Sequence, residues 1–260
     1  MEILDLRGRK GLVIGVANEH SLAWSASQHY RCAGADLAIT FLNEKARVHV
    51  EPLAREVDAA IVAACDVTQP GQLEAVFDRI QGQWGQLDFV LHAIAWARKE
   101  DLQGRLVDSS AAGFAESMQV SCHSLMRMAK LAVPLMGPGA SITTLSYYGA
   151  EKVVDHYNVM GPVKAALEAS VRYLAHELGP SGVRVNAISA GPVSTRAASG
   201  IVHFDELVEA SGRLAPLRRK LEACEVGRVA LFLASDYASA ITGEIVHADA
   251  GLHIEGMVLH

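Results

Sequence analysis

Residues 12–41 read LVIGVANEHSLAWSASQHYRCAGADLAITF, with a short apolar run at each end. The runs Leu12–Val16 and Asp36–Phe41 are apolar almost throughout, which is typical of strands buried on both faces. The segment Ser21–Ala33 between them predicts a helix. This order predicts two parallel strands joined by a right-handed crossover.

The same alternation continues along the 260-residue chain. The further predicted strands are Ala60–Cys65, Phe89–Ala93, Ala140–Leu145, Val183–Ser189 and Glu244–Ala248, with a helix at Gly71–Trp84. We therefore expect an α/β fold, a doubly wound parallel sheet of about seven strands of the Rossmann type. No linker or low-complexity tract interrupts the pattern, so residues 1–260 are expected to form a single domain.

The composition excludes several classes of protein. Hydrophobic residues make up 50% of the chain, which excludes a disordered protein. The net charge is −6, whereas nucleic-acid binders usually carry a basic surface, so this class is excluded. The four cysteines form no Cys-x-x-Cys pair and the eleven histidines have no ligand spacing, so we expect no metal site. Without a signal-peptide pattern or a long apolar run, the expected location is the cytoplasm, away from membranes.

Three stretches without clear periodicity follow the fourth, fifth and sixth predicted strands. They are Trp96–Ser110, Ser146–His156 and Ala190–Ile201. Ligands of an open α/β sheet bind outside the carboxyl ends of its strands. We therefore expect the functional site where these three loops converge.

The first strand leads into a turn that could hold a phosphate group. Gly15 allows a tight turn, and Ser21 could either cap the following helix or bind phosphate. The single glycine departs from the usual Gly-x-Gly-x-x-Gly pattern, and an ordinary strand-to-helix turn is an equal alternative. After the third strand, Asp66 could accept hydrogen bonds from an adenine amino group or cap the next helix.

Tyr157 and Lys164 are the most informative candidates for catalysis. Residues seven apart on a helix differ by about 20° in direction, so the two would share a helix face about 10 Å apart. A nearby ammonium lowers the pKa of a phenol and strengthens it as a donor to a developing oxyanion. Ser146 and Tyr147 are expected to face the same crevice. The alternative is that this spacing is purely structural.

Other residues are more ambiguous. Tyr148 and Lys152 have a Tyr-x-x-x-Lys spacing, but Gly149 lies between them, so Tyr148 is expected to be a pocket or surface residue. His92 ends an apolar strand and is expected to be a buried, hydrogen-bonded histidine. The basic run Leu217–Lys220 is either a solvated face or a docking site for an acidic partner.

The sixth strand is followed by Gly191-Pro192, which predicts a turn, and by Thr195, whose hydroxyl could hold a carboxamide. Small and polar residues follow, which is typical of a mobile substrate lid. We place this lid near residues 194–212, with a plain surface loop as the alternative.

Together these motifs resemble the short-chain dehydrogenase/reductase superfamily, and more narrowly the bacterial NADH-dependent enoyl-acyl-carrier-protein reductases. The likeness extends from Gly11 to about Ala250. The six-residue gap between Tyr157 and Lys164 is specific, because most of the superfamily has three. The matching motifs are Gly15-Val16-Ala17 with Ser21-x-Ala23, Thr144-Leu145-Ser146-Tyr147, Tyr157-Asn158-Val159-Met160-Gly161, Val183–Pro192, and the run from Thr195 to Ile201.

The resemblance implies reduction of the 2,3 double bond of an enoyl thioester in fatty acid synthesis. It implies three catalytic residues: Tyr157 as hydrogen-bond donor to the thioester carbonyl, Lys164 on the nicotinamide ribose, and Tyr147 lining the acyl pocket. The implied NAD-binding residues are Gly15, Ser21, Leu22, Asp66, Val67, Ile94, Lys164, Val193 and Thr195. The implied partners are an enoyl thioester on acyl carrier protein or coenzyme A and three further copies of the chain in a homotetramer.

The sequence departs from the family pattern in several places. Ala93-Ile94-Ala95 stands where Ser-Ile-Gly is usual, and Trp96 follows it. Pro162 lies between Tyr157 and Lys164, where it fits only if the helix begins nearby. The lid carries His203-Phe204-Asp205-Glu206, which is acidic where typical members are basic.

Two alternative functions remain open. One is a carbonyl reductase or alcohol dehydrogenase of the same superfamily, which the Tyr–Lys spacing disfavours. The other is an NAD-binding regulatory protein without catalysis, which the departures at Ala95, Trp96 and Pro162 would favour. For the cofactor, Leu42 follows the second strand where NADPH-using members tend to carry basic residues, so we expect NADH. Lys45 and Arg47 are the basic residues nearest to that position.

Overall fold

The computed structural model describes residues 4–195 and 200–256. Its centre is a seven-stranded sheet with the order β3-β2-β1-β4-β5-β6-β7. Every neighbouring pair of strands is parallel, which confirms the predicted doubly wound α/β fold. The strands are β1 (Lys10–Ile14), β2 (Asp36–Phe41), β3 (Ile61–Ala64), β4 (Phe89–His92), β5 (Ser141–Ser146), β6 (Arg184–Ala190) and β7 (Ile245–Ala248).

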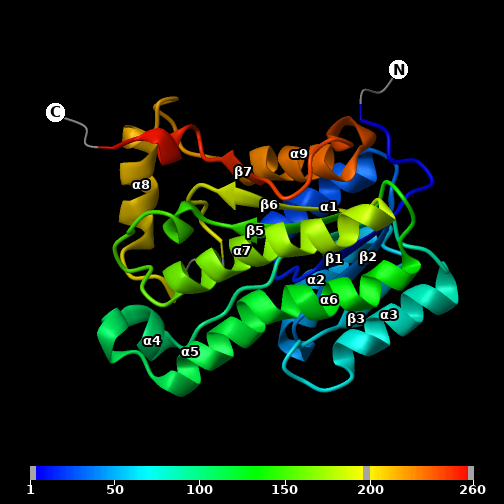
Figure 1. Ribbon diagram of the computed structural model, residues 1–260, viewed down its shortest axis with the longest axis horizontal. Helices are drawn as coiled ribbons and strands as arrows, with labels where there is room; N and C mark the ends of the chain where they lie inside the picture. The colour runs from blue at the N-terminus through cyan, green and yellow to red at the C-terminus, as the bar shows by residue number, and fades with distance from the viewer. Residues whose placement is uncertain (1–3, 196–199, 257–260) are drawn as a thin grey trace.

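Helices cover both faces of the sheet (Figure 1). One face packs against α1 (Leu22–Cys32), α2 (Glu44–Glu56) and α9 (Ala223–Ala234). The other face packs against α3 (Gln72–Gln83), α6 (Ser124–Ala132) and α7 (Met160–Leu178). This double cover explains why the strands are apolar throughout instead of alternating.

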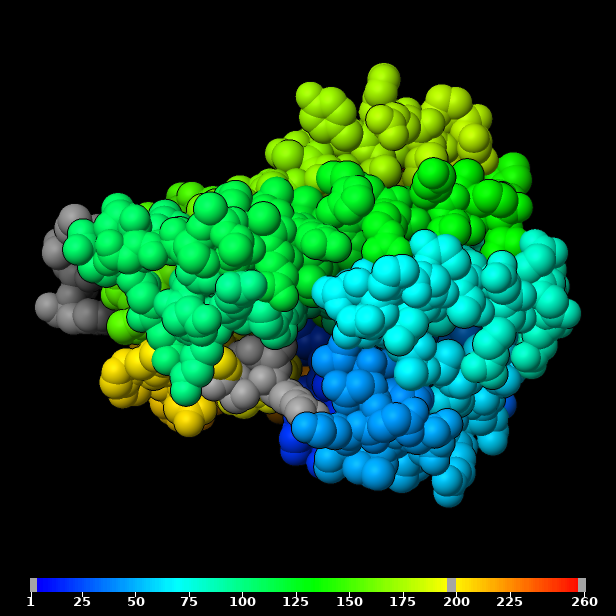
Figure 2. Space-filling model, turned by 90° about the horizontal axis from the view of Figure 1, so that it is seen from below, coloured from blue at the N-terminus to red at the C-terminus, as the bar shows by residue number. Residues whose placement is uncertain are grey.

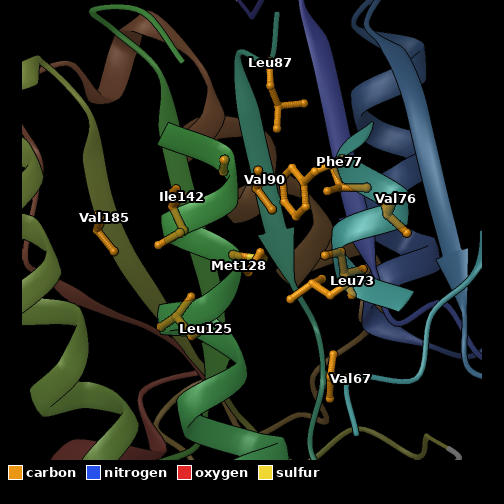
Figure 3. Close-up of a cluster of buried hydrophobic side chains, with 14 of the residues drawn as sticks. Val67, Leu73, Val76, Phe77, Leu87, Val90, Leu125, Met128, Ile142 and Val185 are labelled. Carbon is orange, nitrogen blue, oxygen red and sulfur yellow. The ribbon is translucent and has the colours of Figure 1, made fainter. Parts of the chain in front are cut away.

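The core on the α3–α6–α7 face is built from aliphatic and aromatic side chains of the strands and helices (Figure 3). Leu125 and Met128 of α6 lie against Val90 and Ile142 of the sheet, and all four are at most 1% exposed. Burying a side chain of this size contributes roughly 1.5–3 kcal/mol, so this layer fixes how α6 and α7 lie on the sheet.

Shorter elements gather at the carboxyl edge of the sheet, the edge toward which the strand arrows point (Figure 1). They include α4 (Lys99–Gln103), α5 (Ala111–Met118) and α8 (Phe204–Leu214), together with a five-residue π-helical segment, Gln119–His123, that joins α5 to α6. The 3₁₀ turns are Leu106–Asp108, Val133–Leu135, Tyr148–Ala150, Gly179–Ser181, Asp236–Ala238 and Leu252–Ile254.

The strand boundaries differ from the predicted ones by at most two residues, and β2 matches its prediction at both ends. The largest shift is in β1, which ends at Ile14 because Gly15 has a φ of 102°. The chain leaves the strand conformation there, although the Val16 amide still donates to the Thr40 carbonyl at 3.0 Å.

The predicted lid near residues 194–212 coincides partly with α8. Residues 196–199 of that range lie outside the described part of the chain. Among the described residues, no helix is long and apolar enough to cross a membrane.

Candidate active site

The neighbouring strands β1 and β4 mark the point where the sheet order reverses direction, and a crevice is expected there. A Cβ on Gly15 would lie only 2.4 Å from the Ala93 carbonyl oxygen and 3.3 Å from the Ile94 side chain. Only glycine fits this approach, so the turn after β1 lies directly against the end of β4. Figure 2 shows a recess in the surface between the green segment that includes α5 and the blue N-terminal segment.

Ser21 caps α1. Its Oγ accepts a hydrogen bond from the Trp24 amide at 3.2 Å and donates to the Asn18 carbonyl at 2.8 Å. Of the two roles that the sequence left open for its side chain, the structure therefore shows the cap. The N-terminus of α1 stands next to the Gly15 turn, and the aligned peptide dipoles of a helix favour an anion at that end.

Asp66 lies in the turn after β3. Its Oδ1 accepts hydrogen bonds from the amide and the hydroxyl of Thr68 at 2.9 and 2.7 Å. The alternative that Asp66 caps the next helix is wrong, because α3 begins after Gly71. Arg127 of α6 donates to the Val67 carbonyl at 2.7 Å, which fixes the position of this turn.

Lys164 lies in the second turn of α7, but Tyr157 lies before the helix. The expectation that both share one helix face is therefore wrong. The helix begins at Met160, which makes Pro162 its third residue. Amides of the first turn have no intrahelical acceptor, so Pro162 removes no hydrogen bond there.

Tyr157 is held in a tight turn. Its two neighbours, His156 and Asn158, both have positive φ values, 64° and 40°. The Asn158 side chain donates to the Leu102 carbonyl of α4 at 2.7 Å. Such backbone conformations cost free energy and persist where the surroundings enforce them, often at functional sites.

The Tyr157 ring lies on the backbone of Gly149. A Cβ at that position would be 2.6 Å from the Cδ1 atom of Tyr157. Sequence reasoning used Gly149 only to set aside the Tyr148–Lys152 pair, and it missed this contact. Tyr148 itself lies in the 3₁₀ turn, half-buried, whereas Lys152 is exposed.

Tyr147 packs edge-on against Tyr157, with ring centroids 4.8 Å apart and an interplanar angle of 70°. The Tyr147 hydroxyl is buried, and the side-chain group that interacts with it is the Tyr148 hydroxyl. Burial raises the pKa of both phenols above the ordinary value, and the charge of Glu168 adds to the effect at Tyr157. The expected lowering of the Tyr157 pKa by Lys164 is therefore wrong. Both phenols stay protonated at neutral pH and remain hydrogen-bond donors.

Lys164 is 5% exposed, and its Nζ donates to the Leu145 carbonyl at 2.7 Å. Burial lowers the pKa of Lys164 to about 8, while Glu168 and Cys122 oppose that change. An ammonium has three N–H donors, so the bond to Leu145 leaves two for a ligand.

Glu168 is a buried residue of the site that sequence reasoning missed. Its Oε1 accepts a hydrogen bond from Ser146 Oγ at 2.5 Å. It follows Lys164 by one helical turn on the same face of α7. That spacing was the available signal, because an acidic residue there falls among the apolar residues Leu167 and Val171.

The two tyrosines belong to a cluster of packed, buried apolar side chains, which we call the apolar enclosure. It joins α4, the turn before α7 and the first turn of α7, and Ile201 and Leu207 pack against it. Gln103 of α4 also donates to the Gly200 carbonyl at 3.1 Å. The buried apolar members besides the tyrosines are Leu102, Val154, Val159, Met160 and Val163.

Trp96, in the loop after β4, is 42% exposed. Its amide donates to Ser121 Oγ at 2.8 Å, and the same Oγ donates to the Trp96 carbonyl at 3.0 Å. Ser121 belongs to the π-helical segment, which therefore fixes the loop after β4.

His92, at the end of β4, is buried between Thr144 and Ser124 hydroxyls, as expected, and burial lowers its pKa to about 3.

A second hollow of about 320 Å³ lies between the turn after β1 and the loop after β6. Its lining includes His20 and Val193. Near it, Arg219 is paired with Glu225 at 2.6 Å, and Lys220 is paired with Glu209. The basic run is thus largely neutralised within the chain.

In the helix after β2, the Arg47 guanidinium is paired with two carboxylates, Glu44 at 2.9 Å and Glu51 at 2.7 Å. Leu42 is 52% exposed there. Within the described part of the chain, no group of three or more His, Cys, Asp or Glu side chains could hold a metal ion.

The doubly wound parallel sheet, the Gly15 turn at its switch point and the Tyr157–Lys164 pair at its carboxyl edge define a short-chain dehydrogenase/reductase. A family model described as enoyl-(acyl carrier protein) reductase matches residues 15–253. The chain belongs to this family.

Similar proteins cover nearly the whole chain. The NADH-dependent enoyl-acyl-carrier-protein reductase 1 of Rhizobium meliloti is 48% identical over 97% of this chain and 93% of its own. The reductase of Anaplasma phagocytophilum, solved in complex with NAD, has a TM-score of 0.93 and 49% identity, covering 97% of this chain and 96% of its own. The NADH reductase of Aquifex aeolicus has a TM-score of 0.94 and 43% identity, covering 97% and 99%.

Proposed function

We propose that the protein reduces the 2,3 double bond of an enoyl thioester on acyl carrier protein with NADH. The observation that carries this proposal is the placement of Tyr157, a protonated and buried phenol packed on Tyr147 within an apolar enclosure. Apolar side chains of this kind suit contact with an acyl chain, and a fixed O–H donor suits a carbonyl oxygen on which negative charge develops.

The residues of the crevice fit a dinucleotide. Gly15 leaves no Cβ between the first turn and the end of β4, and the N-terminus of α1 stands beside it. NADH, when bound, supplies the hydride for the β-carbon of the substrate. We assign Gly15, Ser21 and Leu22 to its pyrophosphate. The remaining assignments are Asp66 and Val67 at the adenine, Ile94 at the ribose side, and Val193 and Thr195 at the carboxamide and nearby phosphate.

The catalytic roles follow from the donors that the chain presents. Tyr157 donates a hydrogen bond to the thioester carbonyl oxygen and stabilises the enolate that forms there. Lys164 uses the two N–H groups that Leu145 leaves free to bind the nicotinamide ribose. Tyr147 lines the acyl pocket, and its buried hydroxyl is available to place the substrate.

The proposed reaction is tested by NADH consumption with crotonyl and longer 2-enoyl thioesters of acyl carrier protein and coenzyme A. A 3-ketoacyl thioester and NADPH serve as controls. We expect consumption with enoyl but not with keto substrates, and with NADH in preference to NADPH. Reduction of the keto substrate alone would support a carbonyl reductase instead. NADH binding without turnover of either substrate would support a regulatory protein.

The expected assembly rests on the family resemblance, whereas the single domain and the location rest on the sequence pattern. We propose that residues 1–260 form one domain, with a lid near residues 194–212, and that the chain works in the cytoplasm as a homotetramer. Sedimentation of the purified protein tests the assembly, and a monomer at assay concentration would contradict it.

A further inference from the structure

Glu168 is a buried carboxylate that the proposed reaction does not use. It is 5% exposed and lies on the face of α7 that packs against the sheet. Its Oε1 accepts a 2.5 Å hydrogen bond from Ser146, which directly precedes Tyr147 at the end of β5. Burying a carboxylate costs free energy unless nearby groups stabilise its charge.

We propose that Glu168 is a positioning residue, whose buried carboxylate anchors Ser146 and supplies the counter-charge that keeps Lys164 and Tyr157 protonated. This inference rests on the proposed function, because it concerns the same two donors. Glu168 acts through them and is not placed in contact with substrate or cofactor.

The electrostatic part follows from the position of the three groups. Glu168 and Lys164 are one helical turn apart, and the negative charge raises the pKa of Lys164 against the lowering caused by burial. The same charge raises the pKa of Tyr157. Burial raises the pKa of Glu168 itself, while its contacts with Ser146 and Lys164 lower it. In its ionised form, Glu168 therefore favours the proton-bearing form of both donors.

The anchoring part follows from the hydrogen bonds at the end of β5. Lys164 binds the Leu145 carbonyl at 2.7 Å, and Glu168 binds the next side chain, Ser146, at 2.5 Å. Lys164 and Glu168, one turn apart on α7, therefore form hydrogen bonds with two successive residues of β5. Tyr147 comes directly after them, so its position depends on this pair of contacts.

Other charged or titratable groups face this network from several elements. Because these groups stay in place in the Glu168 variant, a shift in the Lys164 pKa reports the loss of the Glu168 charge alone. They are Arg172 on α7, Glu151 after the Tyr148–Ala150 turn, Cys122 in the π-helical segment and His92 on β4.

The pH dependence has a definite sign. The pKa of Lys164 lies at about 8, so any function of its ammonium is lost as the pH rises through that value. Glu168→Gln keeps an oxygen acceptor for Ser146 but removes the charge, so it lowers the pKa of Lys164 further. We expect the alkaline limb of kcat/KM, and of NADH affinity, to move down by roughly one pH unit.

The experiment compares Glu168→Gln with Ser146→Ala and with Glu177→Gln, which removes a charge from an exposed position of the same helix. At about pH 6, where Lys164 is protonated in every variant, Glu168→Gln should regain nearly wild-type NADH affinity. Ser146→Ala should lower kcat without moving the limb, and Glu177→Gln should change neither. An equal loss for Glu168→Gln at every pH would overturn the electrostatic role.

A second measurement separates this inference from the proposed function. Heteronuclear NMR of the lysine side chains follows the titration of Lys164 in the free protein, without substrate or turnover. A lower titration midpoint in Glu168→Gln supports the inference even if enoyl thioesters are not reduced. An unchanged midpoint refutes it even if the enzyme is an active reductase.

Discussion

Replacing Gly149 by alanine should displace the Tyr157 ring without touching any bound group. The new Cβ would lie 2.6 Å from Cδ1 and 2.9 Å from Cε1 of Tyr157, and 3.1 Å from Cδ1 of Tyr147. Carbon atoms pack at about 3.5–4.0 Å, so the ring must move by about 1 Å. A misplacement of that size can cost about 100-fold in rate.

The backbone itself should accept the change, because Gly149 has no positive φ. We expect kcat with an enoyl thioester to fall about 10- to 100-fold and the free energy of unfolding to fall by about 1–3 kcal/mol from overpacking. NADH affinity should be nearly unchanged. The assay is steady-state turnover, with NADH binding by fluorescence and unfolding by urea.

Gly137→Ala is the matched control, because a Cβ at that position meets no atom within 4 Å. It should leave turnover and stability close to wild type. Full activity of Gly149→Ala, or a crystal structure of it with Tyr157 in its original position, would refute the reasoning.

Tyr157→Phe removes only the hydroxyl from a buried ring, so we expect a fall in kcat of about 100-fold with a folded protein and normal NADH affinity; unchanged kcat would remove Tyr157 from the mechanism. Gly15→Ala combines a φ of 102° with a 2.4 Å approach to the Ala93 carbonyl, so calorimetry should show a lower Tm and titration a weaker NADH affinity. Arg219 and Lys220 are already paired within the chain, so replacing both by alanine should change KM for the carrier-protein substrate less than threefold, with little response to salt. A steep loss of affinity with added salt would show that this run does dock the carrier.

The sheet was predictable because burial on both faces forces apolar strands, and the runs at Asp36–Phe41 and Phe89–Ala93 carry that pattern openly. Strand ends were less predictable, since they depend on single backbone angles such as that of Gly15.

Tyr157 and Lys164 were predictable as a pair from the motif, but their geometry was not. Pro162 indicated a helix start nearby, yet only the structure shows that Tyr157 lies in a turn before Met160. The protonation of Tyr157 was predicted with the wrong sign. One ammonium at a favourable spacing suggested a lowered pKa, whereas burial, which the motif does not report, raises the pKa of Tyr157.

Glu168 and Gly149 were missed for a related reason. Each acts through a contact with a residue far away along the chain, Ser146 in one case and Tyr157 in the other. Residue spacing in the sequence predicts which side chains are neighbours on one helix or strand. It does not predict contacts between different elements, which depend on the three-dimensional fold.

The π-helical segment Gln119–His123 has a consequence for the helical phase of the chain. An extra residue in a helical turn rotates everything beyond it by about 100° relative to a regular α-helix. Met118 on the near side packs against both the apolar enclosure and the core on the α6 face of the sheet, while Leu125 on the far side lies in that core alone. Deleting one residue from this segment would join α5 and α6 into one regular helix and rotate α5 relative to α6. Ser121 would then turn away from the Trp96 backbone. Met118 would lose its contact with the apolar enclosure if Leu125 kept its place in the core.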